Sequence, residues 1–350
     1  MRSPRSSRQQ AAPEALDQQL SSPVAADPDD GNGAVSGVHF DQAVALGQAL
    51  LDGLADVMLG TKSALRAAVI AALSGGHLLI EDVPGVGKTV LAQALAVSLG
   101  AELSRIQGHP DLLPSDVTGV SVYSPDTGTW EFRKGPVFAH VVLVDELNRT
   151  PPRTQSALLE TMEEQQVSVD GLAVPLPRPH FVIATQNPHS QLGTFPLVES
   201  QLDRFAIATT IGYPDAINET RLAMQSGGRY ALADLKAICD PTSWSEAQRA
   251  TESVHVAESV ASYAVDLCRA SRDAPGVLLG ASPRAAIWLI RAAQAEAVLS
   301  SRHYVTPDDV KAVAVGCLAH RLITDESRES IGRAALVVTR LLETTPTPRP

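Results

Sequence analysis

The chain has 350 residues, which is enough for about two domains that each bury a core. Its net charge is −11 and its aromatic residues are 6 Phe, 5 Tyr and 3 Trp, so it offers neither a basic groove nor a stacking surface for nucleic acid. No window approaches the ~18 apolar residues of a membrane span, and no apolar segment follows the basic N-terminus. We therefore expect a cytoplasmic protein with protein partners.

The two ends of the chain have the composition of disordered tails. Residues 1–37 are rich in Ser, Pro, Gln, Asp and Gly, and residues 343–350 include TTPTPRP. Neither segment has enough large apolar side chains to offset the entropy lost on ordering. Between the tails, apolar periodicity first predicts an amphipathic helix over residues 40–58 and a second helix over residues 63–73.

A glycine-rich loop follows in HLLIEDVPGVGKTV, residues 77–90. A strand, a glycine loop and a helix start together predict a phosphate cradle, because glycines let backbone N–H groups turn toward phosphate oxygens and the helix dipole favours an anion. Lys88 is expected to reach the β- and γ-phosphates, and the Thr89 hydroxyl to bind Mg²⁺. The nucleotide-binding residues would be Asp82, Val83, Pro84, Gly85, Val86, Gly87, Lys88, Thr89 and Val90.

Asp82 stands where the G-x-x-x-x-G-K-[ST] pattern begins with glycine. Asp tolerates unusual backbone angles better than most residues, so we expect the site to be kept. The alternative is a glycine-rich turn that binds nothing.

Apolar runs then alternate with helical patterns. A helix over residues 88–99 ends at Gly100, and strands are predicted over residues 103–106, 140–144, 180–185 and 205–211. Strands separated by helices indicate the α/β class, with a parallel sheet covered on both faces and a site at the carboxyl ends of its strands.

Two segments interrupt this alternation. Residues 120–138 contain short β-like runs around a turn at residues 126–128, and residues 166–177 alternate around Asp170-Gly171. Both patterns predict β-hairpins, although a long connection is the alternative for each.

A pair of carboxylates follows the predicted strand over residues 140–144. Asp145 could hold the water shell of Mg²⁺, and Glu146 could orient and polarise the attacking water. Acids at strand ends are common, but these follow the glycine loop by one strand and one helix, which makes the pair specific.

The chain resembles AAA+ ATPases of the MoxR family over roughly residues 40–340. The shared stretches are DVPGVGKT at 82–89, RIQGHPDLLPSDVTG at 105–119, VDELNRTPPRTQSALLETMEE at 144–164, ATQNP at 184–188, ESQLDRF at 199–205 and ASPRA at 281–285. The pair Gly108-His109 departs from the family, which more often has an apolar or aromatic residue followed by Thr.

The resemblance implies an AAA+ core with a five-stranded parallel sheet over residues 38–213, and an all-helical linker and lid over residues 214–342. Lid helices are expected over residues 253–271, 283–299, 307–320 and 327–342, after a linker helix that ends near Pro241. The two hairpins would be the helix-2 insert and the pre-sensor-1 hairpin, which face the pore or a partner in related assemblies.

The resemblance also gives roles to residues outside the glycine-rich loop and the acidic pair. Asn187 would be sensor 1, with turn chemistry beside Pro188 as the alternative. Arg284 follows a capping Ser282 and Pro283, at a helix start where a cation makes sense if an anion is bound. It would be sensor 2, with an exposed structural arginine as the alternative.

Arg204 matches the family's arginine finger, which acts on the nucleotide of the neighbouring subunit. Its alternative role is a salt bridge with Asp203. Arg149 is a lower-ranked candidate for the same interface.

The resemblance thus implies an ATPase that uses Mg²⁺ and forms a homo-oligomer, usually a hexameric ring, to remodel, mature or activate protein complexes. Its partners would be a protein client and a protein with a von Willebrand factor A domain. Three alternatives stay open: a magnesium-chelatase-like motor, a nucleic-acid motor, and a nucleotide-dependent scaffold without turnover.

Overall fold

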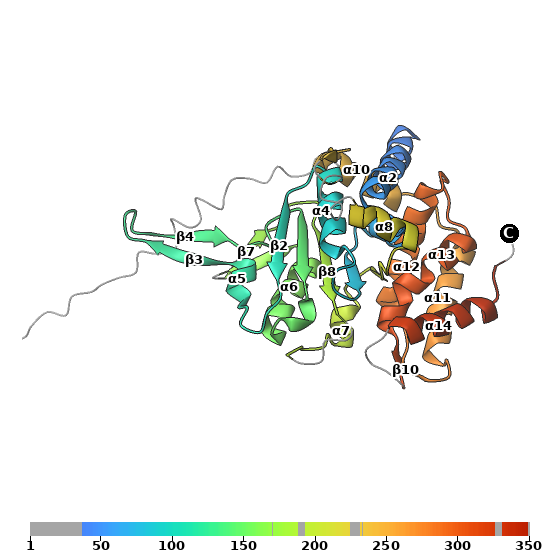
Figure 1. Cartoon of the computed structure of the whole chain (residues 1–350). Helices are drawn as coiled ribbons and strands as arrows, with labels where there is room; N and C mark the ends of the chain where they lie inside the picture. The colour runs from blue at the N-terminus through green and yellow to red at the C-terminus, as the bar shows by residue number, and fades with distance from the viewer. Residues whose placement is uncertain are drawn as a thin grey trace, which may run out of the picture.

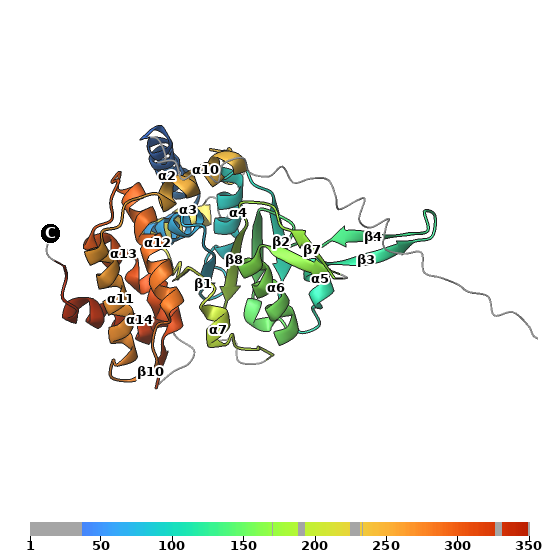
Figure 2. The ribbon, with the colours of Figure 1, turned by 180° about the vertical axis from the view of Figure 1, so that it is seen from behind.

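The computed structural model describes residues 37–169, 171–187, 193–224, 232, 234–325 and 331–348. An α/β core and a helical domain lie side by side, as the two opposite views in Figures 1 and 2 show. Residues 1–36 of the expected N-terminal tail lie outside the described residues.

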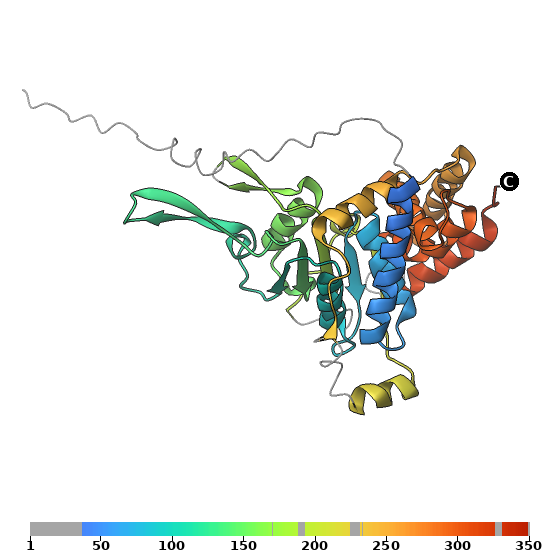
Figure 3. The ribbon, with the colours of Figure 1, turned by 90° about the horizontal axis from the view of Figure 1, so that it is seen from above.

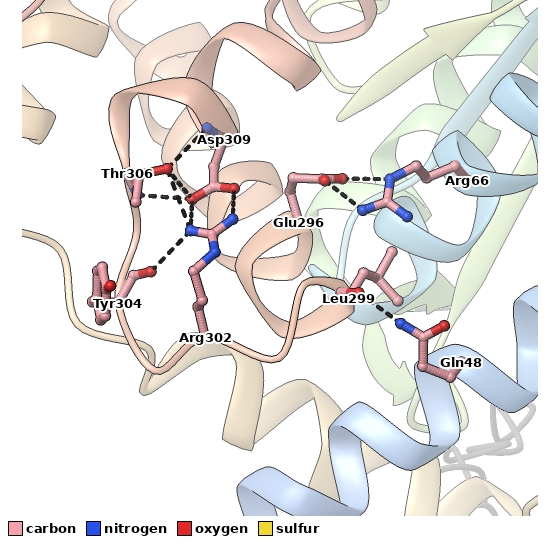
Figure 4. Close-up of polar contacts among 8 residues, drawn as sticks. All are labelled: Gln48, Arg66, Glu296, Leu299, Arg302, Tyr304, Thr306 and Asp309. Carbon is pink, nitrogen blue, oxygen red and sulfur yellow. Dashed lines mark hydrogen bonds and ion pairs between the residues drawn. The ribbon is translucent and has the colours of Figure 1, made fainter.

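The described chain begins with two helices, α2 (Gly37–Val57) and α3 (Lys62–Leu73). Phe40 and Leu54 of α2 are buried, as the amphipathic pattern predicts, and Leu50 is fully buried as well. Polar contacts join both helices to the helical domain (Figure 4). Arg66 of α3 pairs with Glu296 at 2.8 Å, and the Gln48 side chain of α2 donates to the Leu299 carbonyl at 2.6 Å.

The core is built on the expected five-stranded parallel sheet, in the order β2-β5-β8-β1-β9. Its strands are β1 (Leu78–Glu81), β2 (Leu103–Gln107), β5 (Val141–Asp145), β8 (Phe181–Gln186) and β9 (Ile207–Thr209). The pairs β1–β8, β5–β8 and β2–β5 are in parallel register. Their carboxyl ends therefore meet at one edge, next to the loop that follows β1.

Alternate residues of the strands serve two separate cores, which is why these strands read as continuous apolar runs. Val141, Leu143 and Ile183 pack with helices α2, α3 and α4 (Lys88–Ser98), while Val142 and Val182 pack with α6 (Pro152–Glu164). Two short helices of the core, α5 (Pro114–Thr118) and α7 (Glu199–Leu202), were not expected from the sequence.

Both predicted hairpins are confirmed. Strands β3 (Gly119–Ser124) and β4 (Thr129–Lys134) pair antiparallel, and so do β6 (Gln166–Val169) and β7 (Leu172–Pro175). The β3–β4 hairpin extends from the core on the side away from the helical domain (Figures 1 and 3). Asp170, in the turn of the second hairpin, lies outside the described residues.

The second part of the chain is mainly helical. Its helices are α8 (Ala216–Met224), α10 (Pro241–Glu252), α11 (Glu258–Arg272), α12 (Pro283–Leu299), α13 (Pro307–Leu318) and α14 (Ile331–Thr344), and a 3-10 turn, η2 (Ala319–Arg321), follows α13. Helix α8 stands apart from the rest in Figure 3. The domain also contains a short antiparallel pair, β10 (Val277–Leu279) and β11 (Ile323–Thr324), which the all-helical expectation lacked.

Three helix boundaries differ from the prediction. Pro241 begins α10 and does not end a helix, because the Asp240 carboxylate caps this helix by accepting from the Ser243 N–H at 2.8 Å. The helix expected from residue 253 begins at Glu258. Helix α14 reaches Thr344, so the expected C-terminal tail at 343–350 begins later, and residues 326–330 before α14 lie outside the description.

Candidate nucleotide-binding site

The glycine-rich loop leaves the carboxyl end of β1 and leads into α4. Gly85 and Gly87 have φ of 89° and 96°. Residues with a Cβ rarely adopt such positive φ angles, whereas glycine adopts them without strain. Gly87 is the N-cap of α4 and has no side chain to cap the helix. The first N–H groups of α4 are thus open to an anion, as the motif predicts.

The ammonium group of Lys88 is held against the backbone of the glycine-rich loop. Its Nζ donates to the Asp82 carbonyl oxygen at 2.6 Å, across the turn. Burial lowers the pKa of the Lys88 ammonium, while the negative charges of Asp82, Asp145 and Glu146 act in the opposite direction.

The side chain of Asp82 explains why Asp stands where the motif has glycine. An unusual backbone angle does not, because the φ of Asp82 is not positive. Its Oδ2 accepts from the N–H groups of Ile211 and Gly212, both at 2.7 Å, and its Oδ1 accepts from Val83 at 2.8 Å. The carboxylate therefore ties the first residue of the loop to the segment that follows β9.

Asp145 ends β5 and is buried beside Thr89. The Thr89 Oγ1 lies 3.4 Å from the Asp145 Oδ2, and the Thr185 Oγ1 lies 3.5 Å from its Oδ1. A hydroxyl and a carboxylate that converge in this way fit Mg²⁺, which takes oxygen ligands. The Nε of Arg105 on β2 also donates to the same Oδ2 at 2.7 Å, a contact that the sequence did not indicate.

Glu146 lies just beyond the strand with a left-handed φ of 56°. Its N–H donates to the Thr185 hydroxyl at 2.9 Å, which fixes the turn. Its carboxylate contacts Arg149 at 3.0 Å and Gln107 at 3.4 Å. Arg149, expected near a subunit interface, thus holds Glu146 within the same chain.

Gly108 packs directly against this turn. Its N–H donates to the Asp145 carbonyl at 2.7 Å, and a Cβ at this position would overlap the carbonyl oxygens of Asp145 and Glu146. The departure from the family pattern at residue 108 therefore permits a close approach of two backbones.

Asn187 directly follows β8, the strand that lies between β5 and β1. This order places it between the two acids and the loop, where a sensor of the terminal phosphate is expected. Its backbone carbonyl accepts from the Asn148 side chain at 3.3 Å, while Pro188 lies outside the described residues.

Arg204 and Arg284 share one carboxylate. Both pair with Glu163 at the end of α6, Arg204 at 3.1 Å. In this structure the anion beside Arg284 is the Glu163 carboxylate. The Asp203–Arg204 salt bridge considered as an alternative is not formed, because the Asp203 carboxylate binds Arg321 and Ser282 instead.

The shared carboxylate lies at the amino edge of the sheet. The backbone carbonyl of Met162, the residue before Glu163, lies 3.1 Å from the Nε2 of His77, and His77 precedes β1. The glycine-rich loop follows β1 and lies at the opposite edge. The two arginines therefore face away from the phosphate cradle of their own chain.

A cavity of about 320 Å³ lies beside the loop and was not foreseen from the sequence. It is lined by the end of α2, the loop and the segment before and within α8, with Val57, Met58, Val86, Tyr213 and Leu222 among its residues. Apolar walls next to a phosphate cradle suit a flat base. The loop residues of this wall belong to the glycine-rich motif, whereas Val57, Met58, Tyr213 and Leu222 carry no motif.

Together, the parallel sheet, the phosphate cradle, the paired acids and the helical domain define a P-loop nucleotide-binding protein of the AAA type. Residues 77–207 match the ATPase family associated with various cellular activities (AAA), and residues 269–340 match the AAA lid domain.

Whole-chain comparisons agree with this class. The chain is 44% identical over 284 residues to YeaC of Bacillus subtilis, covering 81% of this chain and 89% of YeaC. It is 35% identical over 304 residues to Chaperone MoxR1 of Mycobacterium tuberculosis, covering 84% and 80%. It is 31% identical to Protein MoxR of Paracoccus denitrificans, covering 83% and 91%. This chain belongs to the MoxR family of AAA+ ATPases.

A solved structure is similar over nearly the whole fold. A protein of Cytophaga hutchinsonii assigned as an ATPase superposes with a TM-score of 0.80 at 34% identity, covering 89% of this chain and 98% of that one. Across the described helices, none is both long and apolar enough to cross a membrane.

Proposed function

We propose that this protein hydrolyses ATP with Mg²⁺ and uses the nucleotide cycle to remodel or activate other proteins. The observation that carries the proposal is the convergence of Lys88, Thr89, Asp145 and Glu146 at one edge of the sheet. Each has the chemistry that phosphoryl transfer to water requires. The family membership supports the same reaction.

Thr89 and Asp145 would hold Mg²⁺, which would neutralise charge on the phosphates. Lys88 exchanges the Asp82 carbonyl for phosphate oxygens. Glu146 accepts hydrogen bonds from the attacking water once its contacts with Arg149 and Gln107 open. These two contacts hold Glu146 in place before the nucleotide binds.

The arginine pair supports an oligomer. Arg204 and Arg284 lie at the far edge of the sheet from their own P-loop, so a nucleotide that they contact belongs to another copy of the chain. An arginine finger supplied in this way brings about 10³ to 10⁵ in rate. Any closed ring gives every subunit one such neighbour, and the resemblance to the family makes a hexamer the expected size.

The client and partner are proposed on similarity. The name Chaperone MoxR1 supports a protein client, and the net charge of −11 argues against a nucleic-acid motor. A partner with a von Willebrand factor A domain and a magnesium-chelatase-like role both stay predictions, as does the cytoplasmic location.

Phosphate release and Mg·ATP titration test the reaction. The wild-type protein should bind and hydrolyse ATP, Lys88→Ala should lose binding, and Glu146→Gln should bind without turnover. Lys311→Ala and Glu252→Gln, at exposed ion pairs of the helical domain, are matched controls that should behave as wild type. Binding without turnover in the wild type would favour the scaffold, and stimulation by DNA would favour the nucleic-acid motor.

The client is tested by capture. Glu146→Gln should hold its client in the ATP state, so a pull-down with this variant and ATP should retain proteins that Lys88→Ala does not. Equal capture by both variants would argue against a nucleotide-dependent client.

A further inference from the structure

Arg321 is a buried arginine outside the nucleotide site. It ends the 3-10 turn η2 of the helical domain and is 5% exposed. Buried guanidinium groups are rare unless they are paired and fully hydrogen-bonded. Its contacts therefore indicate what the group is for.

The guanidinium of Arg321 holds one short segment of the core. It donates to the backbone carbonyls of Asp203 at 3.1 Å, Phe205 at 2.6 Å and Ala206 at 3.3 Å, and to the Asp203 carboxylate at 2.8 Å. One further bond goes to the Cys317 carbonyl of its own domain. These core acceptors lie in residues 203–206, the segment that carries Arg204.

The same carboxylate also fixes the start of α12. The Ser282 hydroxyl donates to both oxygens of Asp203, at 3.0 Å and 2.9 Å. Ser282 caps α12, whose second residue is Arg284. One Asp203 carboxylate thus links η2, the start of α12 and the segment of Arg204.

One hydrogen-bond network, formed by Arg321, Asp203 and Ser282, therefore holds the backbone segments of the two arginines that meet at Glu163. Arg204 directly follows Asp203, and Arg284 lies two residues after Ser282. His320 adds a contact with the Phe205 carbonyl at 3.0 Å. A shift of the helical domain would move both arginine-bearing segments together.

We propose that Arg321 is a positioning residue that fixes Arg204 and Arg284 as one unit for the nucleotide of the neighbouring subunit. This inference rests on the proposed ATPase function. A planar guanidinium can hold several carbonyls in a fixed arrangement. A lysine would keep the charge beside Asp203 but could not reach all of these acceptors.

Two measurements on the full-length protein test the proposal. Amide hydrogen exchange reports whether residues 203–206 are held, and needs no ATPase activity. Single-turnover hydrolysis is measured for Arg321→Lys in the wild-type background and in an Arg204→Ala/Arg284→Ala background. Arg291→Met, which loses an exposed ion pair with Glu252 in the same domain, is the matched control.

Arg321→Lys should speed exchange at residues 203–206 and lower the hydrolysis rate about 10-fold or more, while the Kd for nucleotide changes less than about 3-fold. In the background without the two arginines, it should change the rate less than about 2-fold, because it acts only through them. Arg291→Met should change neither measurement.

The same loss in both backgrounds would show a merely structural role and overturn the proposal, as would unchanged exchange at residues 203–206. Asp203→Asn, which removes the charge and keeps the side-chain shape, repeats the test if Arg321→Lys does not fold. Failure of the proposed function is distinguishable, because the wild type would then show no turnover while the exchange result still judges the network.

Discussion

The Asp82 carboxylate stabilises the junction between the phosphate-binding loop and the end of the sheet. It satisfies the N–H groups of Ile211 and Gly212, of which Ile211 is buried. Asp82→Ala would leave these donors without an acceptor. We expect it to lower the free energy of unfolding by about 2–4 kcal/mol, measured by urea denaturation.

Two variants make that measurement specific. Asp82→Asn keeps an acceptor oxygen and should lose clearly less than Asp82→Ala. Asp126→Ala, in the exposed turn of the β3–β4 hairpin, should stay within about 0.5 kcal/mol of wild type. Equal stability of Asp82→Ala and wild type would show that the two N–H groups find other acceptors.

Glu163 forms ion pairs with Arg204 and Arg284, whose guanidinium groups are expected to contact a nucleotide. Its side chain is 40% exposed, so its two ion pairs contribute only about 0–1 kcal/mol to stability. Glu163→Gln removes a competing anion, and turnover should be equal to or higher than in wild type. Arg204→Ala should instead keep nucleotide affinity while turnover falls about 10³-fold or more. A loss with Glu163→Gln as large as with Arg204→Ala would show that Glu163 is needed to position the finger.

Site residues within motifs could be predicted individually, while their partners could not. Lys88, Thr89, Asp145 and Glu146 follow from local spacing. Arg321 lies outside the shared stretches, and Glu163 lies within residues 144–164 but has no role that the stretch reveals. The partners Arg284 and Asp203 are more than 100 residues away from Glu163 and Arg321, respectively. The apolar cavity beside the glycine-rich loop could not be predicted either, because its walls come from segments that are distant in the sequence.

At the level of elements, the start of α13 is held by a charged cap. Asp309 accepts hydrogen bonds from the Thr306 N–H at 2.7 Å and from the Thr306 hydroxyl at 2.8 Å, and it pairs with Arg302 (Figure 4). Burial acts to raise the pKa of the Asp309 carboxyl, but the hydrogen bonds from Arg302 and Thr306 outweigh it and lower the pKa.

A lowered pKa in the folded state means that the ionised Asp309 contributes stability at neutral pH. This contribution is present above the ordinary pKa of about 4 and is lost as the pH falls through the lower folded value. Asp309→Asn should thus unfold about 1–3 kcal/mol more easily at pH 7, and the difference should shrink below about pH 4. Urea denaturation at both pH values checks this, and a difference independent of pH would contradict it.

Elements with a long pattern or a distinctive turn could be predicted from the sequence. Alternation around a turn predicted both hairpins, and Ser282 caps α12 before Pro283, as expected. Helices α5 and α7 are too short to show a period. The sequence could not show whether Pro241 begins or ends a helix, because proline is found both at the first turn of a helix and just after its end.

For the whole molecule, the opposite placement of the cradle and the arginine pair predicts activity only between copies. Lys88→Ala binds no nucleotide but keeps its arginines, and Arg204→Ala keeps its cradle. Mixing these inactive variants should restore turnover, because some Arg204→Ala sites gain a neighbour with an intact finger. Mixed oligomers that form without any turnover would contradict catalysis across the interface. Each variant mixed with itself is the control.

Helices α2 and α3 contact the helical domain as well as the core. Leu299 packs against Gly47 of α2, and the Ala72 carbonyl at the end of α3 accepts from Trp244 and Gln248 of α10, at 3.0 Å and 2.7 Å. A fragment that starts at residue 77, where the recognisable ATPase region begins, would leave the buried faces of α10 and α12 bare. Such a fragment should aggregate on expression, whereas one that starts at residue 37 should remain dispersed, as light scattering would show. The smallest piece able to fold therefore begins well ahead of its first motif.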